Sequence, residues 1–183
     1  FARVKHLLAM TTLDNTYDET ELREFHARLV KAMGSDDLAY TVEPKIDGVA
    51  VSLTYEHGKL TRAVTRGDGE EGDDVTINVK TIRELPHALA KAPNAKTPKA
   101  KDGEAEDLFT GEESAGELPA VIEIRGEIFL RDEEFQRINQ LQEEADEAPY
   151  ANPRNLAAGT LKQLDPKLVA ARELSLPVIM VRR

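Results

Sequence analysis

The spacing of apolar residues near the start of the chain is typical of a helix. Between residues 18 and 34, large apolar residues recur every three or four positions, so that they share one helix face. They are Leu22, Phe25, Leu29 and Met33. Asp18 can cap the first turn with Glu21 three residues on as a capping box, and Gly34 suits a C-terminal cap. The pattern predicts a helix over this segment.

From residue 39 onward the period changes to two. Apolar and polar residues alternate in four runs, as they do in strands with one buried face: 41–47, 49–55, 60–66 and 121–130. Asp47-Gly48 and His57-Gly58 are turn signals between the first three runs. These runs predict an antiparallel meander, with a further strand later in the chain.

Four further segments are expected to contain helices: 73–86, 132–147, 154–164 and 166–172. Asp165-Pro166 is typical of the start of the last one. An apolar segment, 174–181, follows it. Strands mixed with helices but without a regular βαβ rhythm indicate an α+β fold with antiparallel sheets and flanking helices.

Residues 91–118 interrupt this pattern. The stretch is rich in Ala, Lys, Glu, Pro and Gly, and such a composition cannot bury enough apolar surface to offset the entropy of ordering it. We expect a mobile insertion within a single domain, 1–183, and not a boundary between two domains.

Composition excludes several classes of protein. No apolar run approaches the ~18 residues that a membrane-spanning helix needs, and Phe1-Ala2-Arg3 leads into no signal-peptide core. The chain has no cysteine, which excludes disulfides and thiolate metal sites and fits a cytoplasmic protein. The four histidines show no metal-ligand spacing. The net charge of −10 predicts weak binding to DNA unless the cations gather on one face.

Residues 43–48 are the most informative candidate for chemistry. In a strand, Glu43, Lys45 and Asp47 would project to the same side. A lysine between two acids could serve as a nucleophilic amine. The residues alone leave a second interpretation open, in which an exposed polar strand face precedes an Asp-Gly turn.

Two other segments could contribute to a site on the sheet. Residues 65–69 read Thr-Arg-Gly-Asp-Gly, and their glycines allow a sharp turn or a close approach to a ligand. In the run from Ile122 to Phe129, Glu123, Arg125 and Glu127 share the face opposite the isoleucines. A plain loop and a half-solvated strand are the alternatives.

The segment 151–165 could supply cations. Arg154 and Lys162 lie eight residues apart, roughly two helical turns, so they can share a face. The alternative is a surface pair without a ligand.

Taken together and in order, these segments resemble the adenylation domain of bacterial NAD⁺-dependent DNA ligases. That family carries E-x-K-x-D-G, T-R-G-D-G, V-R-G-E and A-N-P-R-N-x-A-A-G-[ST]-L-[RK]-Q, and an upstream M-L-S-L-D-N that resembles residues 10–15 here. The resemblance runs from about His6 to Arg172, interrupted by 91–118. It implies a covalent nucleotidyltransferase fold, incomplete at its C-terminal side.

The resemblance implies a role for each matching residue. Lys45 would be the nucleophile that becomes lysyl-AMP as NMN leaves. Glu43 would face the adenine, and Glu127 would bind the ribose hydroxyls. Asp47 would lie beside the nucleophile, near metal-bound water, and Arg66 would contact the nucleotide.

Other matches imply contacts at the edges of the site. Thr12 and Leu13 stand where the family contacts the adenosine end of NAD⁺. Arg154 and Lys162 would serve the phosphates or the nicked DNA.

The function implied is that of part of a ligase that joins 3′-hydroxyl and 5′-phosphate ends at nicks in double-stranded DNA during replication and repair. NAD⁺ would be the AMP donor, with Mg²⁺ or Mn²⁺, in a cytoplasmic monomer. We expect this chain by itself not to seal nicks, because the family's later D-G-V-V-I-K motif and its DNA-binding modules have no match here.

The sequence also departs from the family pattern. Thr11-Thr12 replaces Leu-Ser, Lys162 replaces the common arginine, and the family's adenine-stacking side chain has no counterpart in 176–183. Two alternatives therefore stay open: an ATP-dependent polynucleotide ligase or RNA-capping type of nucleotidyltransferase, and a nucleotide-binding fragment without catalysis.

Overall fold

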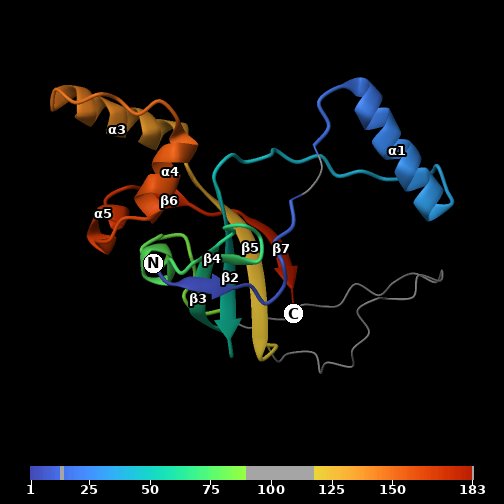
Figure 1. The fold of residues 1–183 in the computed structure, drawn as a ribbon, viewed down its shortest axis with the longest axis horizontal. Helices are drawn as coiled ribbons and strands as arrows, with labels where there is room; N and C mark the ends of the chain where they lie inside the picture. The colour runs from blue at the N-terminus through green and yellow to red at the C-terminus, as the bar shows by residue number, and fades with distance from the viewer. Residues whose placement is uncertain (13–14, 90–117, 183) are drawn as a thin grey trace.

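The protein is built around one antiparallel sheet of five strands. The computed structural model describes residues 1–12, 15–89 and 118–182 (Figure 1). The sheet contains β2 (Val49–Glu56), β3 (Lys59–Thr65), β5 (Val121–Leu130), β6 (Leu174–Ser175) and β7 (Val178–Arg182). The strand order is β3-β2-β5, and both β6 and β7 pair with β5. The expected α+β fold with antiparallel sheet is confirmed.

The β2–β3 hairpin forms where the alternating pattern and the turn signal predict it. Val51, Leu53 and Tyr55 are at most 1% exposed. The turn residues His57 and Gly58 both have positive φ angles, 48° and 75°. Two consecutive positive φ angles match the right-handed twist of the flanking strands, so the turn sets the hairpin register.

The pairing of β2 with β5 gives the sheet two chemically different faces. Val51 lies opposite Gly126 and Leu53 opposite Ile124, whereas Ser52 lies opposite Arg125. Since paired residues of antiparallel strands point to the same side, one face is apolar. The other, the polar face, carries the three charged residues of β5: Glu123, Arg125 and Glu127.

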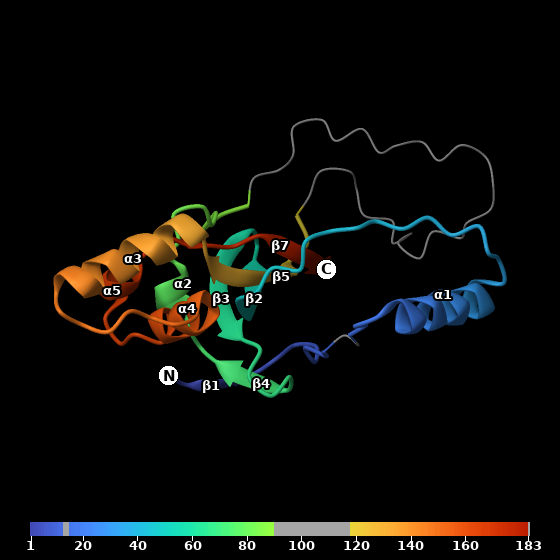
Figure 2. The ribbon, with the colours of Figure 1, turned by 90° about the horizontal axis from the view of Figure 1, so that it is seen from above.

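The apolar face is covered by helices. Figure 2 shows α2 (Thr76–Val79), α3 (Asp132–Glu144), α4 (Pro153–Leu161) and α5 (Pro166–Ala170) gathered on one side of the sheet. Leu156, Ala157 and Leu161 of α4 are at most 3% exposed and belong to the same core cluster as the β2 side chains. α4 therefore fixes its own N-terminus relative to β2 and β5.

The expected strand over 41–47 is wrong. The segment has no regular structure, and Val42 is 93% exposed. Among the described residues no strand pairs with it, and Pro44 offers no N–H to a partner. An alternating pattern without a neighbouring edge to bond remains irregular chain.

The expected helix over 73–86 is also largely wrong. Only α2 is helical, and the preceding residues form β4 (Glu71–Asp73), which pairs with β1 (Arg3–Lys5). Neither of these two strands was expected from the pattern. The β-branched residues between 75 and 82 disfavour a longer helix, and Asn78 instead donates side-chain hydrogen bonds to the carbonyls of Leu161 and Gln163.

The first expected helix is confirmed as α1 (Glu19–Met33). The Glu21 N–H donates to Asp18 Oδ1 at 2.9 Å, and Gly34 ends the helix with a φ of 69°. None of its residues is buried, and both views show it lying apart from the sheet (Figures 1 and 2).

The other expected helices are present with shorter bounds in α3, α4 and α5. The expected insertion at 91–118 lies, except for Leu118, outside the described residues. Among the helices that the structure describes, none is long and apolar enough to cross a membrane.

Candidate active site

Glu127 occupies the centre of the candidate site, on the polar face of β5. Its carboxylate Oε1 accepts a hydrogen bond from the Gly48 N–H at 3.2 Å. Burial raises the pKa of the Glu127 carboxyl above its usual value, and the Gly48 hydrogen bond opposes that rise. The positive charges of Lys45, Arg154 and Arg66, in this order, also lower the Glu127 pKa. A half-buried acid thus faces three cations.

Gly48 brings the lysine-bearing segment against the sheet. A Cβ at this position would lie 2.2 Å from the Ile128 carbonyl oxygen, a separation that real side chains do not tolerate. The absence of a side chain lets the backbone after Lys45 pass directly over β5. The close approach allows Glu127 to reach the Gly48 N–H.

Arg154 joins α4 to the same segment. Its Nε donates to the Gly48 carbonyl at 3.1 Å, and its Nη1 lies 3.4 Å from Asp47 Oδ1. Asn152, two residues earlier, caps the helix by accepting from the Asn155 N–H at 3.0 Å. The guanidinium therefore stands between a capped helix end and the residues that follow Lys45.

The Thr-Arg-Gly-Asp-Gly loop closes another side of the site. Gly67 and Gly69 have φ angles of 58° and 99°, which side chains rarely adopt. The Asp68 carboxylate accepts from the backbone N–H groups of Glu71 and Glu70, and these bonds lower the pKa of Asp68. The Arg66 N–H donates to the Ala50 carbonyl at 2.9 Å, which holds the end of β3 beside β2.

The segment 6–10 is bound against this loop. His6 donates its backbone N–H to the Glu70 carbonyl at 2.9 Å, and its ring Nε2 lies 3.0 Å from the Arg66 carbonyl oxygen. The Met10 N–H donates to the Gly69 carbonyl at 2.8 Å. Residues upstream of Thr12 therefore share the site with residues about 60 positions later.

The polar face of β5 is more buried than a half-solvated strand. Glu123 and Arg125 are 5% and 9% exposed. Arg125 donates through Nη2 to the Leu8 carbonyl at 2.7 Å and through Nη1 to the Ala9 carbonyl at 3.1 Å. The sequence pattern placed Arg125 on the polar face of β5 but did not single it out as a site residue, because its partners in the 6–10 segment are backbone carbonyls, which carry no signature in the sequence.

The structure brings most of the predicted site residues together. Glu127 and Arg154 both bond to the Gly48 backbone, Asp47 pairs with Arg154, and the charges of Lys45 and Arg66 act on Glu127. The expectation that Glu43 and Lys45 share a strand face is wrong, because 41–47 is not a strand. Both lie on an exposed, irregular segment, so their directions depend on the turn at Gly48 and not on strand geometry.

The remaining predicted residues have different surroundings. Lys162 lies 2.8 Å from Asp73 Oδ2, and this hydrogen bond lowers the pKa of Asp73. Arg154 and Lys162 were expected to share a helix face, but their side chains have different partners. Arg154 contacts Asp47 and Gly48, whereas Lys162 contacts Asp73 of β4. Thr12 is exposed, and Leu13 lies outside the described residues.

Ligands for a metal are sparse. Within residues 1–12, 15–89 and 118–182, no three His, Asp or Glu side chains are grouped to hold an ion. Asp47, like Glu43, lies two residues from the lysine, and its side chain is 65% exposed. A hard divalent cation bound here would take most of its ligands from water and from a phosphate-bearing substrate.

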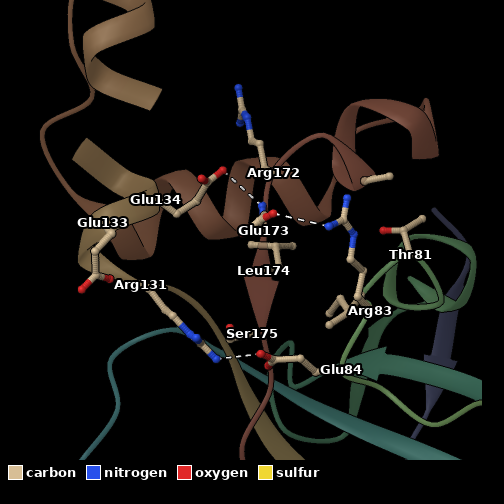
Figure 3. Close-up of a pocket in the computed structure, with 12 residues that line it drawn as sticks. Thr81, Arg83, Glu84, Arg131, Glu133, Glu134, Arg172, Glu173, Leu174 and Ser175 are labelled. Atoms are coloured by element: carbon tan, nitrogen blue, oxygen red, sulfur yellow. Dashed lines mark hydrogen bonds and ion pairs between the residues drawn. The ribbon is translucent and has the colours of Figure 1, made fainter. Parts of the chain in front are cut away.

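A separate cavity of about 490 Å³ lies on the helical side of the molecule (Figure 3). It is bounded by the turn after α2, the start of α3 and the segment from α5 into β6. Two of its three arginines are in ion pairs: Arg131 Nη2 lies 2.6 Å from Glu84 Oε1, and Arg83 Nη1 lies 3.5 Å from Glu173 Oε1. It shares no lining residue with the Glu127 cluster, which we therefore regard as the better candidate for chemistry.

Comparison with known proteins identifies relatives over almost the whole chain. A family model described as "NAD-dependent DNA ligase adenylation domain" matches residues 1–101 and 112–182. Over 174 residues the chain is 56% identical to DNA ligase 1 of Opitutus terrae, covering 95% of this chain and 23% of the relative. It is 45% identical over 177 residues to a DNA ligase of Methylobacterium nodulans, covering 95% and 18%.

A third relative, a DNA ligase of Thermotoga maritima, is 44% identical over 174 residues, which cover 95% of this chain and 21% of the relative. The chain thus spans about a fifth of the length of these curated relatives. Residues 102–111, which the family model leaves unmatched, fall within the stretch expected to be an insertion.

Proposed function

The chain belongs to the family of NAD-dependent DNA ligase adenylation domains, and we propose that its site transfers AMP from NAD⁺ to Lys45. The observation that carries this proposal is the arrangement around Glu127. A half-buried carboxylate is held by the Gly48 N–H and faces the charges of Lys45, Arg154 and Arg66. Such a cluster offers a nucleophile, cations for phosphates and an acceptor for hydroxyls within one site.

The proposed step is a phosphoryl transfer. The lone pair of Lys45 Nζ attacks the phosphorus of the AMP half of NAD⁺, and the bond from that phosphorus to the bridging oxygen breaks. NMN leaves with the oxygen, and the amine proton passes to solvent. Reactions of this type depend on alignment and on neutralising the phosphate charge. Arg66 and Arg154 are the cations placed to do so.

Other residues would hold the nucleoside. Glu127 can accept hydrogen bonds from the ribose hydroxyls, since only one of its oxygens is used by Gly48. We assign Glu43 to the adenine, with Thr12 and Leu13 at the adenosine end of NAD⁺. Lys162 would serve phosphates or DNA after leaving Asp73, with which it pairs in the free chain.

Among the described residues, few acidic side chains are available to hold a metal ion. A divalent cation would therefore bind together with the substrate, whose phosphates supply further ligands. Asp47 would hold Mg²⁺ or Mn²⁺ through water, and Arg154 would balance the charge of the Asp47 carboxylate until the nucleotide enters. When bound, the cation would neutralise developing charge on the transferred phosphate.

Intact-mass spectrometry after incubation with NAD⁺ and Mg²⁺ tests the proposal. We expect a gain of one AMP that is absent in Lys45→Ala and retained in Lys59→Ala, a matched change at an exposed lysine of β3. The same incubation with ATP should give no gain. Modification by ATP alone would favour the ATP-dependent class of nucleotidyltransferase.

The exposed position of Lys45 on an irregular segment favours a second candidate function, that of a nucleotide-binding module without catalysis. NAD⁺ binding without any gain in mass would support it against the first.

For the whole protein we propose the activity named for the relatives, that of a DNA ligase. Its adenylated lysine would pass AMP to a 5′-phosphate at a nick, and the 3′-hydroxyl would then displace AMP to join the strands. We also propose that it works as a monomer in the cytoplasm, in replication and repair, with the nucleotidyltransferase fold of its family. Light scattering on the purified whole protein would test its oligomeric state, because a dimer would have twice the mass of a monomer.

A further inference from the structure

Arg125 is a buried charged residue for which neither the sequence pattern nor the proposed transfer step assigns a role. Its side chain is 11% exposed, and its Nε lies 2.5 Å from Oε1 of Glu123, whose side chain is 5% exposed. A buried ion pair must be matched by further hydrogen bonds to offset its loss of hydration. The further bonds run to the Leu8 and Ala9 carbonyls, more than 100 residues earlier in the chain.

The segment that Arg125 holds is bound at its two ends, by His6 to the Glu70 carbonyl and by Met10 to the Gly69 carbonyl, and Arg125 holds the residues between them. Residues 6–12 belong to no strand or helix, and the Leu7 and Leu8 side chains are 62% and 51% exposed. Their backbone carbonyls would otherwise face water. The rigid fork of an arginine can donate to two neighbouring carbonyls at once, which gives the segment a fixed position without strand pairing.

The same segment leads directly to Thr12. Met10 is bound to the Gly69 carbonyl and is 6% exposed. Two residues of chain span at most about 7 Å, so holding residues 8–10 confines Thr12 to the neighbourhood of the loop after Arg66. Arg125 also lies two residues from Glu127, on the same face of β5.

We propose that Arg125 is a positioning residue, which fixes the Leu8–Met10 segment over the polar face of the sheet and so prepares the adenosine end of the NAD⁺ site. The inference rests on the proposed function in taking NAD⁺ as the ligand. Holding the segment before binding removes the need to order it when the nucleotide arrives, and such preorganisation increases affinity. Arg125 would act through its contacts with Glu123 and with the Leu8 and Ala9 carbonyls.

Two variants test the inference. Arg125→Met removes every donor but leaves Glu123 without a partner and can unfold the chain. Arg125→Lys keeps the charge beside Glu123 and loses the fork. Arg131→Lys is the matched control, because Arg131 follows the same strand but pairs with Glu84, away from the site. Val169→Ala, in the core of α5, controls for a loss of stability as such.

Calorimetry with NAD⁺ and hydrogen exchange of the Met10 amide provide the measurements. We expect Arg125→Lys to weaken NAD⁺ binding about tenfold, which corresponds to about 1.4 kcal/mol, and to accelerate exchange at Met10. The core amides of β2 should keep their protection. Arg131→Lys and Val169→Ala should leave the affinity within about twofold, even where Val169→Ala lowers the Tm more than Arg125→Lys does.

Faster exchange at Met10 with unchanged NAD⁺ affinity would overturn the inference, since Arg125 would then be a structural clamp only. Unchanged exchange would overturn it as well. NAD⁺ binding without lysyl-AMP formation would contradict the proposed transfer but not the role of Arg125. A chain that binds no NAD⁺ at all would contradict both.

Discussion

The Glu127 carboxylate is placed by backbone register as much as by its own side chain. It lies opposite Ala50 in the β2–β5 pairing, where a small neighbour leaves room above the sheet. Burial is the main cause of its raised pKa, and three cations only partly compensate. A ligand that supplies hydrogen-bond donors to the Glu127 carboxylate would lower this pKa again.

This pKa predicts a pH dependence of stability. The folded chain binds the Glu127 proton more tightly than the unfolded chain does, so its contribution is fully present below the usual pKa of 4.5 and is lost as the pH rises through the folded value. A glutamine at position 127 is neutral at every pH, so Glu127→Gln should not lose stability through this ionisation as the pH rises. In urea unfolding between pH 4 and 8, the free energy of unfolding of the Gln variant should increase relative to that of the unaltered chain as the pH rises.

Glu56→Gln, at an exposed carboxylate at the end of β2, is the control. Its free energy of unfolding should depend on pH in the same way as that of the unaltered chain. The interpretation of Glu127 would be wrong if the Gln variant instead became relatively less stable with rising pH. In the adenylation assay, Glu127→Gln should lower the yield of lysyl-AMP, because a neutral amide binds the ribose hydroxyls more weakly than a carboxylate does.

Gly48 is the other residue whose neighbours allow a specific test. A Cβ there would lie 2.2 Å from the Ile128 carbonyl oxygen, so Gly48→Ala must displace the start of β2 or the strand beside it. We expect loss of lysyl-AMP formation by at least tenfold and a lower Tm. Strain of this kind typically costs about 1–3 kcal/mol.

Gly159→Ala provides the matched control, since no atom lies within 4 Å of a Cβ at that position in α4. Alanine has the higher helix propensity, by up to about 1 kcal/mol, so this variant should be as active as the unaltered chain and at least as stable. Equal activity of both alanine variants would show that the close approach at Gly48 is dispensable.

At the scale of elements, α1 and α4 have the same kind of cap but different surroundings. Asp18 accepts the Glu21 N–H at 2.9 Å, and Asn152 accepts the Asn155 N–H at 3.0 Å. None of α1 is buried, whereas four residues of α4 are. Helical stability in proteins comes mainly from packing of an apolar face, so α1 should open independently of the sheet and α4 should not.

Removing each cap tests whether α1 opens independently of the sheet and whether α4 opens together with it. Asp18→Ala should cost α1 about 1 kcal/mol, seen as faster amide exchange within α1, while the unfolding midpoint of the sheet stays unchanged. Asn152→Ala should instead lower that midpoint. A common shift of the midpoint by both variants would mean that α1 unfolds together with the sheet.

At the scale of the whole molecule, charge sets what this chain can do with DNA. The net charge is −10, whereas affinity for DNA comes largely from cations that neutralise phosphates. The chain also spans only about a fifth of the length of its relatives. The three cations whose charges act on Glu127 are too few to hold a duplex.

We therefore expect the 183-residue polypeptide not to seal a labelled nicked duplex, even with NAD⁺ and Mg²⁺, under conditions in which Lys45 is adenylated. Its binding to the duplex should be weak and nearly independent of salt between 50 and 200 mM, a range over which a binder with many phosphate contacts loses several orders of magnitude, about 10³–10⁵. Sealing that disappears in Lys45→Ala would contradict the prediction. A longer DNA ligase from one of the relatives is the positive control.

Local features of the chain were determined by the sequence alone. The alternation of 49–55 and 121–130, the His57-Gly58 turn and the caps at Asp18 and Gly34 each act within a few residues. Their elements could be predicted because period, turn chemistry and capping are local interactions. The order of the four motifs along the chain likewise indicates the family.

Contacts between distant segments were decided only by the tertiary structure. The pattern of 41–47 predicted a strand, but a strand needs an edge to bond, and none of the described strands offers one. β1 and β4 form because residues about 68 positions apart supply that edge to each other. Arg125 reaches the Leu8 and Ala9 carbonyls, and backbone acceptors carry no signature in the sequence. Which residues surround Glu127 depends on strand register and on the path at Gly48, and both are set by the packing of the whole chain.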